Sequence, residues 1–203
     1  MRLAVNGQEI KFSDSESMVF VGDLLDWLET EYLMTDQCIT NFNIAGNDEF
    51  NYRDQKFLSL KLTEIPFIAI RVRSFDAVFH ESLEELNEEL TKATHSVPQI
   101  VGYIEKHDEK ACATLVEFLK TIGVFATIFA EDIGWKFGDT LEKTAELNEK
   151  LERAMTRLVN AQENNYWVSI CDLLEYEILP VLENWQKIAE ATIATLPQTS
   201  KEI

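Results

Sequence analysis

The stretch NNYWVSICDLLEYEILPVLENWQKIAEATIATL, residues 164–196, decides the fold of the larger part of the chain. Apolar and small side chains recur in it at alternating steps of four and three residues: Trp167, Cys171, Leu174, Ile178, Val181, Trp185, Ile188 and Thr192. This spacing places one continuous stripe on a single face of a helix, as in a helical bundle or a coiled coil. A stripe of this length needs other helices to cover it.

Three preceding segments are predicted to supply those helices. The first covers residues 75–93, and the third covers residues 139–162. The second begins after Ser96, with Pro98 in its first turn, where a missing N–H costs nothing. It either runs on to residue 132, which the pattern favours, or breaks within residues 106–110. Four helices joined by short loops should alternate in direction, so we expect an antiparallel four-helix bundle.

The first third of the chain shows the alternation of strands. Asn6-Gly7 lies between two short alternating segments, and this dipeptide is the strongest short-range signal for a hairpin because both residues accept a positive φ. The patterns that follow predict a helix over residues 18–32 and strands at residues 38–44, 57–62 and 67–73.

This order of elements resembles the ubiquitin-like β-grasp fold, in which the last strand lies beside the first in parallel. The resemblance covers about the first 74 residues and concerns the fold alone. Family members that conjugate or carry sulfur act through a free C-terminal Gly-Gly tail, whereas here Arg73-Ser74 leads into a helix and the chain ends in Lys201-Glu202-Ile203. That departure argues against either role.

The predicted class is therefore α+β: a small β-grasp-like sheet with one helix, then an antiparallel four-helix bundle. The domains are residues 1–74 and 75–203, and because no linker separates them we expect them to pack on each other.

Charge is the strongest compositional feature. The 203 residues carry a formal net charge of −18 and give a pI of about 4.5. This disfavours binding to nucleic acid or to an anionic membrane, since both reward basic surfaces. It permits basic partners, and it is also explained by solubility alone. No uninterrupted apolar run reaches the roughly 20 residues that span a bilayer. Three scattered cysteines without a CxxC motif are typical of a reducing cytoplasm.

Motifs for catalysis or metal binding are not found. A di-metal site in a helical bundle needs Glu-x-x-His on two helices, and no acidic residue stands three positions before His80, His95 or His107. Asp76, His80 and Glu84 share one helix face, for which a solvated surface is the favoured reading. Cys112 and Cys171 lie near the apolar stripes and are expected to be buried thiols. We therefore predict no cofactor, no metal and no catalytic residues, although an enzyme is not excluded.

The best candidate for a binding surface lies on the back of the last helix. At about 100° per residue, Tyr176 points away from the apolar stripe, with Leu173 and Leu179 on either side of it. Trp135 and Phe137, in the loop before the third helix, form a second candidate contact. Either the N-terminal domain or a partner protein covers these residues. Pro180 should bend the helix beside them by removing the bond to the Tyr176 carbonyl.

These observations favour a non-enzymatic protein-interaction module, an adaptor or chaperone-like protein that binds a partner protein through a bundle face. One alternative is an acidic decoy that mimics nucleic acid, with the glutamate row of residues 81–89 as its surface. Another is an enzyme or small-ligand binder with a site between the two domains. Pairing of exposed helix faces also leaves a homodimer open.

Overall fold

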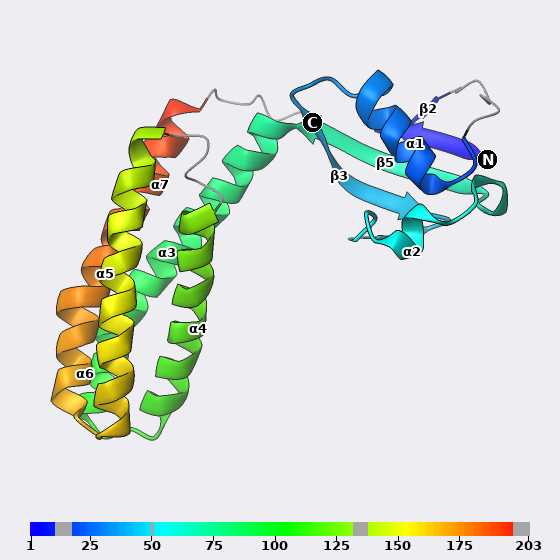
Figure 1. Ribbon diagram of the computed structural model, residues 1–203. Coiled ribbons are helices and arrows are strands. Elements are labelled where there is room, and N and C mark those ends of the chain that lie inside the picture. The colour runs from blue at the N-terminus through cyan, green and yellow to red at the C-terminus, as the bar shows by residue number, and fades with distance from the viewer. Residues whose placement is uncertain (11–17, 50, 132–137, 197–203) are drawn as a thin grey trace. The chain divides into compact units, whose positions relative to one another are not determined.

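The computed structural model describes residues 1–10, 18–49, 51–131 and 138–196 (Figure 1). It has a mixed five-stranded sheet near the N-terminus and helices over the rest of the described chain, which establishes the α+β class. The chain divides into two compact units, Met1–Phe79 and His80–Leu196, called here the sheet unit and the helical unit. Ser74, the expected domain boundary, is the last residue of the final strand.

The sheet unit is built on a central pair of parallel strands. Its strands are β1 (Arg2–Val5), β2 (Gln8–Ile10), β3 (Gln37–Ile44), β4 (Asn47–Asp48) and β5 (Phe67–Ser74), in the order β2-β1-β5-β3-β4. β1 runs parallel to β5, with Leu3 opposite Ile68, and the other pairings are antiparallel. The predicted parallel pairing of the first and last strands is confirmed, and the arrangement is compatible with a β-grasp-like fold.

The predicted hairpin at Asn6-Gly7 is also confirmed, and Asn6 does more than turn the chain. Asn6 and Gly7 take φ values of 49° and 78°. The Asn6 side chain donates from Nδ2 to the Val72 carbonyl at 3.0 Å and accepts the Val72 N–H on Oδ1 at 2.9 Å. The amide therefore imitates a strand residue and extends the β1–β5 pairing beyond Val5.

One helical segment covers a face of this sheet. α1 (Val21–Trp27) continues into the π-helical turn η1 (Leu28–Tyr32), so the helix expected over residues 18–32 is confirmed from Val21 onward, and residues 18–20 lie before it. The core of the unit joins this segment to β1, β3 and β5, and its fully or almost fully buried members include Leu3, Leu24, Leu28, Phe42 and Ile68. Burial of each such side chain stabilises the fold by roughly 1.5–3 kcal/mol.

The strand predicted at residues 57–62 is wrong. That region forms the short helix α2 (Gln55–Leu58) and the 3-10 turn η2 (Leu62–Glu64), and its contact with extended backbone is an isolated bridge between Lys61 and Phe20. The helical turn brings Phe57 and Leu58 together against the core. A strand would point these two neighbours to opposite faces, so packing prevails over the alternation.

The helical unit contains long helices that lie side by side (Figure 1). They are α3 (Phe75–Glu105), α4 (Lys110–Glu131), α5 (Gly138–Glu163) and the stretch formed by α6 (Trp167–Leu173), the π-helical turn η3 (Leu174–Ile178) and α7 (Leu179–Thr195). Trp185 is fully buried, and its ring stacks on Phe129 of α4 at 4.8 Å between centroids. The predicted third and last helices are confirmed.

The boundary between the first two predicted helices is wrong. α3 passes through Ala93 and Pro98 without ending, because Leu90, Val97 and Ile104 keep one buried face across this region. Ser96 caps nothing, since its hydroxyl bonds back to the Ala93 carbonyl. The favoured continuity through residues 106–110 is also wrong. The chain breaks there, with His107 at a φ of 52° and Asp108 accepting the Lys110 N–H.

Within the described residues, α4 is the one helix long and apolar enough to cross a membrane by length and composition, over Lys110–Ala130. It is one-sided. Phe118, Ile122 and Phe125 are buried, whereas Val124 is exposed and the ion pair of Glu117 with Lys120 interrupts the outer side. A core helix of a soluble protein has the same composition, so this feature alone assigns no membrane role.

Candidate functional site

The helical unit has a groove between α5 and the η3–α7 stretch, called here the α5–α7 groove. It consists of two adjoining hollows of about 560 and 390 Å³, which share Leu147, Lys150 and Asn184 in their walls. Along α5 it extends from Lys143 to Arg157, which at about 1.5 Å per residue is about 20 Å. The groove is therefore long enough to hold a segment of chain.

Apolar side chains line its base. Leu147 comes from α5, Pro180, Val181 and Ile188 come from α7, and the Tyr176 ring lies at one end. Val181 is buried, Leu147 and Ile188 are half-buried, and Tyr176 is 72% exposed. An exposed aromatic ring beside an apolar hollow is typical of a surface that a partner covers.

The margins of the groove carry basic side chains. These are Lys143, Lys150, Arg153, Arg157 and Lys187. Lys150 pairs with Glu146 at 2.7 Å, Arg153 pairs with Glu149 at 3.2 Å, and Arg157 pairs with Glu177 across to η3. Five cations against three carboxylates give this surface the opposite sign to the chain as a whole.

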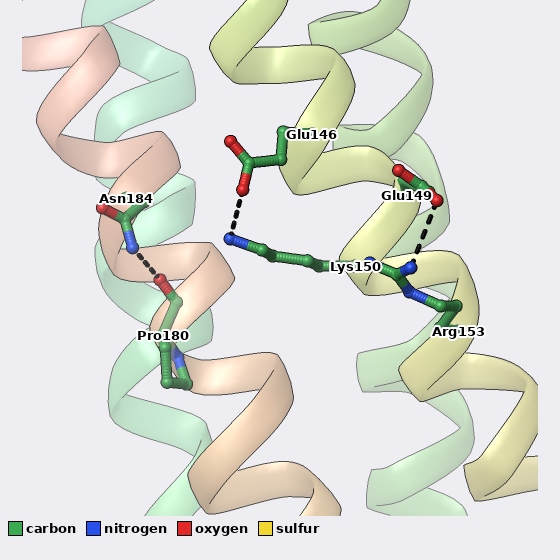
Figure 2. Close-up of polar contacts among 6 residues, drawn as sticks. All are labelled: Glu146, Glu149, Lys150, Arg153, Pro180 and Asn184. Atoms are coloured by element: carbon green, nitrogen blue, oxygen red, sulfur yellow. Dashed lines mark hydrogen bonds and ion pairs between the residues drawn. The ribbon is translucent and has the colours of Figure 1, made fainter.

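Figure 2 shows how the middle of the groove is arranged. Glu146 and Lys150 reach from α5 toward α7, and on α7 the Asn184 amide donates to the Pro180 carbonyl at 2.6 Å. The Lys150 ammonium holds the pKa of Glu146 below its usual range, so this carboxylate stays ionised at neutral pH. Such a group suits ion pairing and is poorly suited to proton transfer.

Tyr176 lies within a π-helical turn that directly precedes Pro180. Pro180 has no N–H, and the turn before it closes as a π-helix in which the Leu179 N–H bonds to the Leu174 carbonyl. The expected disturbance at Pro180 thus takes the form of a π-turn, a feature frequent at functional sites. Both Leu173 and Leu174 point into the core here, while Tyr176 stays outside.

The predicted site residues are therefore placed differently from one another. Tyr176 lies in the wall of the groove, Leu179 is partly buried, and Leu173 is 4% exposed and belongs to the core. Trp135 and Phe137 lie outside the described residues. The basic residues of α5 were missed, although the spacing of Lys143, Lys150, Arg153 and Arg157 at steps of seven, three and four places them near one face.

The remaining candidates for chemistry are metal ligands and thiols. No cluster of three or more potential metal ligands occurs among the residues that the structure describes. Burial raises the pKa of the Cys171 thiol, aided by Glu105, Glu175 and Asp172, and burial also raises that of Cys38. Raised pKa values keep both thiols protonated and unreactive. Cys112 is exposed, so its predicted burial is wrong.

Comparison with known proteins identifies the family of the helical unit. Residues 77–188 match the family model described as "Domain of unknown function (DUF8042)", which is more than half of the chain. The chain belongs to this family. The DUF8042 match includes most of the α5–α7 groove and leaves β1 to β5 outside it. Neither the curated proteins nor the solved structures give a match to the chain.

Proposed function

We propose that this protein is a non-enzymatic protein-interaction module, an adaptor or chaperone-like protein, that docks a partner protein on the α5–α7 groove. In this proposal α3, α4, α5 and the α6–α7 stretch act as an antiparallel four-helix bundle, and the sheet unit is a ubiquitin-like β-grasp domain. The bundle supplies a rigid surface, since its helices bury their apolar stripes against one another.

The observation that carries the proposal is the exposure of Tyr176. Its ring is 72% exposed and stands in the wall of an apolar hollow with Pro180 and Val181. Tyrosine contributes a large contact area with little loss of side-chain entropy, and it is enriched among residues that dominate binding energies.

Site-specific photo-cross-linking tests the proposal. A photo-reactive phenylalanine analogue replaces Tyr176 in one form of the full chain and Val168 in a matched control form. Val168 lies on α6, is 75% exposed and does not line the groove. We expect a protein adduct from position 176 in native lysate, absent from position 168 and lost when Lys150 and Arg157 are both changed to Glu. Equal adducts from both positions, or none from position 176, would overturn the docking site.

The glutamate row of α3 favours a second candidate, the acidic decoy. Glu81, Glu84, Glu85, Glu88 and Glu89 are all exposed along one stretch of this helix. A decoy would displace DNA from a basic DNA-binding protein, and changing Glu81, Glu85 and Glu88 to Gln would abolish the displacement. The matched control changes Glu142, Glu152 and Glu163 of α5 to Gln, which removes the same charge elsewhere. Loss of displacement in both variants, or no displacement by the natural chain, counts against the decoy.

A further inference from the structure

We propose that the α5–α7 groove binds an acidic, amphipathic helical segment of a partner protein, an inference that rests on the docking function proposed above. The net charge of −18 by itself favours basic partners. Within the groove this preference is reversed, because basic side chains lie along its margins: Lys143, Lys150, Arg153, Arg157 and Lys187. A segment that brings carboxylates to these positions is attracted there and repelled by most of the remaining surface.

The basic side chains are available to a partner. Lys150 and Glu146 are 50% and 64% exposed, and Arg153 and Glu149 are 62% and 65% exposed. Exposed ion pairs contribute only about 0–1 kcal/mol each, so exchange of Glu146 or Glu149 for a partner carboxylate meets little resistance. Lys143 and Lys187 make no ion pair within the part of the chain that the structure describes.

The base of the groove selects a protein segment over a nucleic acid. Leu147, Val181 and Ile188 offer apolar surface that a phosphate backbone cannot use but that a row of leucine or isoleucine side chains would cover. A nucleic acid longer than the groove would also carry its charge onto the acidic surface beyond it. An amphipathic peptide carries its charge only where the margins are basic.

The shape of the groove fits a helix. Its sides are two neighbouring helices, and a third helix packs into such a furrow with its side chains between theirs. About 20 Å of length corresponds to nearly four helical turns, enough for apolar anchors at positions i, i+3 or i+4, and i+7. Carboxylates on both flanks of that apolar face would then meet the basic residues of α5 on one side and Lys187 on the other.

Peptide display provides an unbiased test. The probe is a library of random peptides of about 16 residues, long enough for four helical turns, selected on the full-length protein. The counter-variant is Lys150→Glu/Arg157→Glu. The matched control is Lys92→Glu/Lys120→Glu, which makes the same change of net charge at exposed, ion-paired lysines on α3 and α4. Circular dichroism verifies that both variants keep their helices.

We expect the selected peptides to be acidic, with apolar residues at helical spacing. Binding should fall at least about tenfold in Lys150→Glu/Arg157→Glu and stay unchanged in the control, because the lost pairs lie at the contact. Raising the ionic strength should weaken it for the same reason. Neutral, basic or extended peptides, or equal losses in both variants, would overturn the inference. So would tight binding of a single-stranded oligonucleotide that Lys150→Glu/Arg157→Glu abolishes.

Failure of the inference is distinguishable from failure of the docking function. Selected peptides that lack acidic residues, yet lose binding on Tyr176→Asp, leave the docking site in place and remove the acidic partner. If the selected peptides bind both Tyr176→Asp and Lys150→Glu/Arg157→Glu as tightly as they bind the natural chain, the docking site and the acidic partner are both disproved. The Val168→Asp variant controls for an added charge at an exposed site outside the groove.

Discussion

The two units reach a buried core by different routes. The sheet unit depends on pairings between distant parts of the chain, such as Leu3 with Ile68, and its register is decided at a few backbone positions. The helical unit depends on stripes that repeat within each helix. These stripes survive Pro98 inside α3 and the π-turn η3, because neighbouring turns keep the same face buried. We therefore expect the stability of the sheet unit to be sensitive to single polar side chains that define its register. We expect the stability of the helical unit to be most sensitive to single large apolar side chains.

The largest effect is expected from Trp185→Ala in the helical unit. The substitution removes a fully buried ring and its stacking on Phe129, which should cost about 3–5 kcal/mol. Hydrogen exchange followed by mass spectrometry should show lost protection in residues 80–196 and unchanged protection in residues 1–79. The converse variant, Phe42→Ala, should reverse the pattern, since Phe42 is 1% exposed in the sheet core. Equal losses in both units from either change would mean that they unfold as one.

The next effect concerns Asn6, where the sheet unit relies on one amide. Asn6→Ala removes both hydrogen bonds to Val72 and places alanine at a positive φ, which together should destabilise the unit by about 2–3 kcal/mol. Asn6→Gly removes the same bonds but accepts the φ, so it should cost less. Urea unfolding of the three forms measures the order. Equal stabilities of Ala and Gly variants would show that backbone strain contributes nothing here.

Most of the elements of this fold are readable from local signals. Asn6-Gly7 marks the hairpin because two adjacent residues must accept a positive φ, and the stripe from Leu174 to Trp185 marks a bundle helix because its period matches the helical turn. Errors arose where two local signals conflicted. Pro98 and the Ser96 hydroxyl suggest a helix start, yet burial of Val97 and Ile104 keeps α3 continuous. The free energy that a local helix propensity contributes is smaller than the free energy gained by burying several side chains.

The candidate site was only partly predictable. Tyr176 follows from helical projection alone, since it lies opposite the stripe on its own helix. The basic margin depends on the pairing of α5 with α7, which no spacing within one segment specifies. A regular helical period predicts Leu173 on the outer face, whereas both Leu173 and Leu174 are buried where the π-turn follows. The inserted residue of a π-turn changes the phase of every projection across it.

A smaller effect is expected at Asn148, which contrasts with Asn6. The Asn148 side chain on α5 keeps its Oδ1 buried without a partner in the described chain, and its Nδ2 reaches the Ala126 carbonyl only at 3.5 Å. Asn148→Leu should stabilise the helical unit by about 1 kcal/mol, because the unpaired carbonyl no longer has to be buried. Thermal unfolding compares it with the natural chain. No gain in stability would indicate that the Asn148 carbonyl is satisfied by water.

The smallest effect concerns the stability of the sheet unit at acidic pH. The Asp23 carboxylate accepts the backbone N–H groups of Phe20 and Val19 at 2.8 Å each, which lowers its pKa below the ordinary 3.8. A lowered pKa in the folded state gives stability that is present above about pH 3.8 and is lost as the pH falls through the folded value. The contribution is modest because the group is exposed.

Asp23→Asn should therefore flatten the acid side of the stability profile of the sheet unit while leaving the helical unit unchanged. Asparagine keeps an oxygen that can accept one of the same bonds, so the variant removes the titrating charge with little change in shape. Urea midpoints measured from pH 6 down to about pH 2.5, resolved by unit through hydrogen exchange, provide the comparison. The control Asp26→Asn removes a charge from the same helix without touching either amide. A profile as steep in Asp23→Asn as in the natural chain would show that the acid sensitivity arises elsewhere.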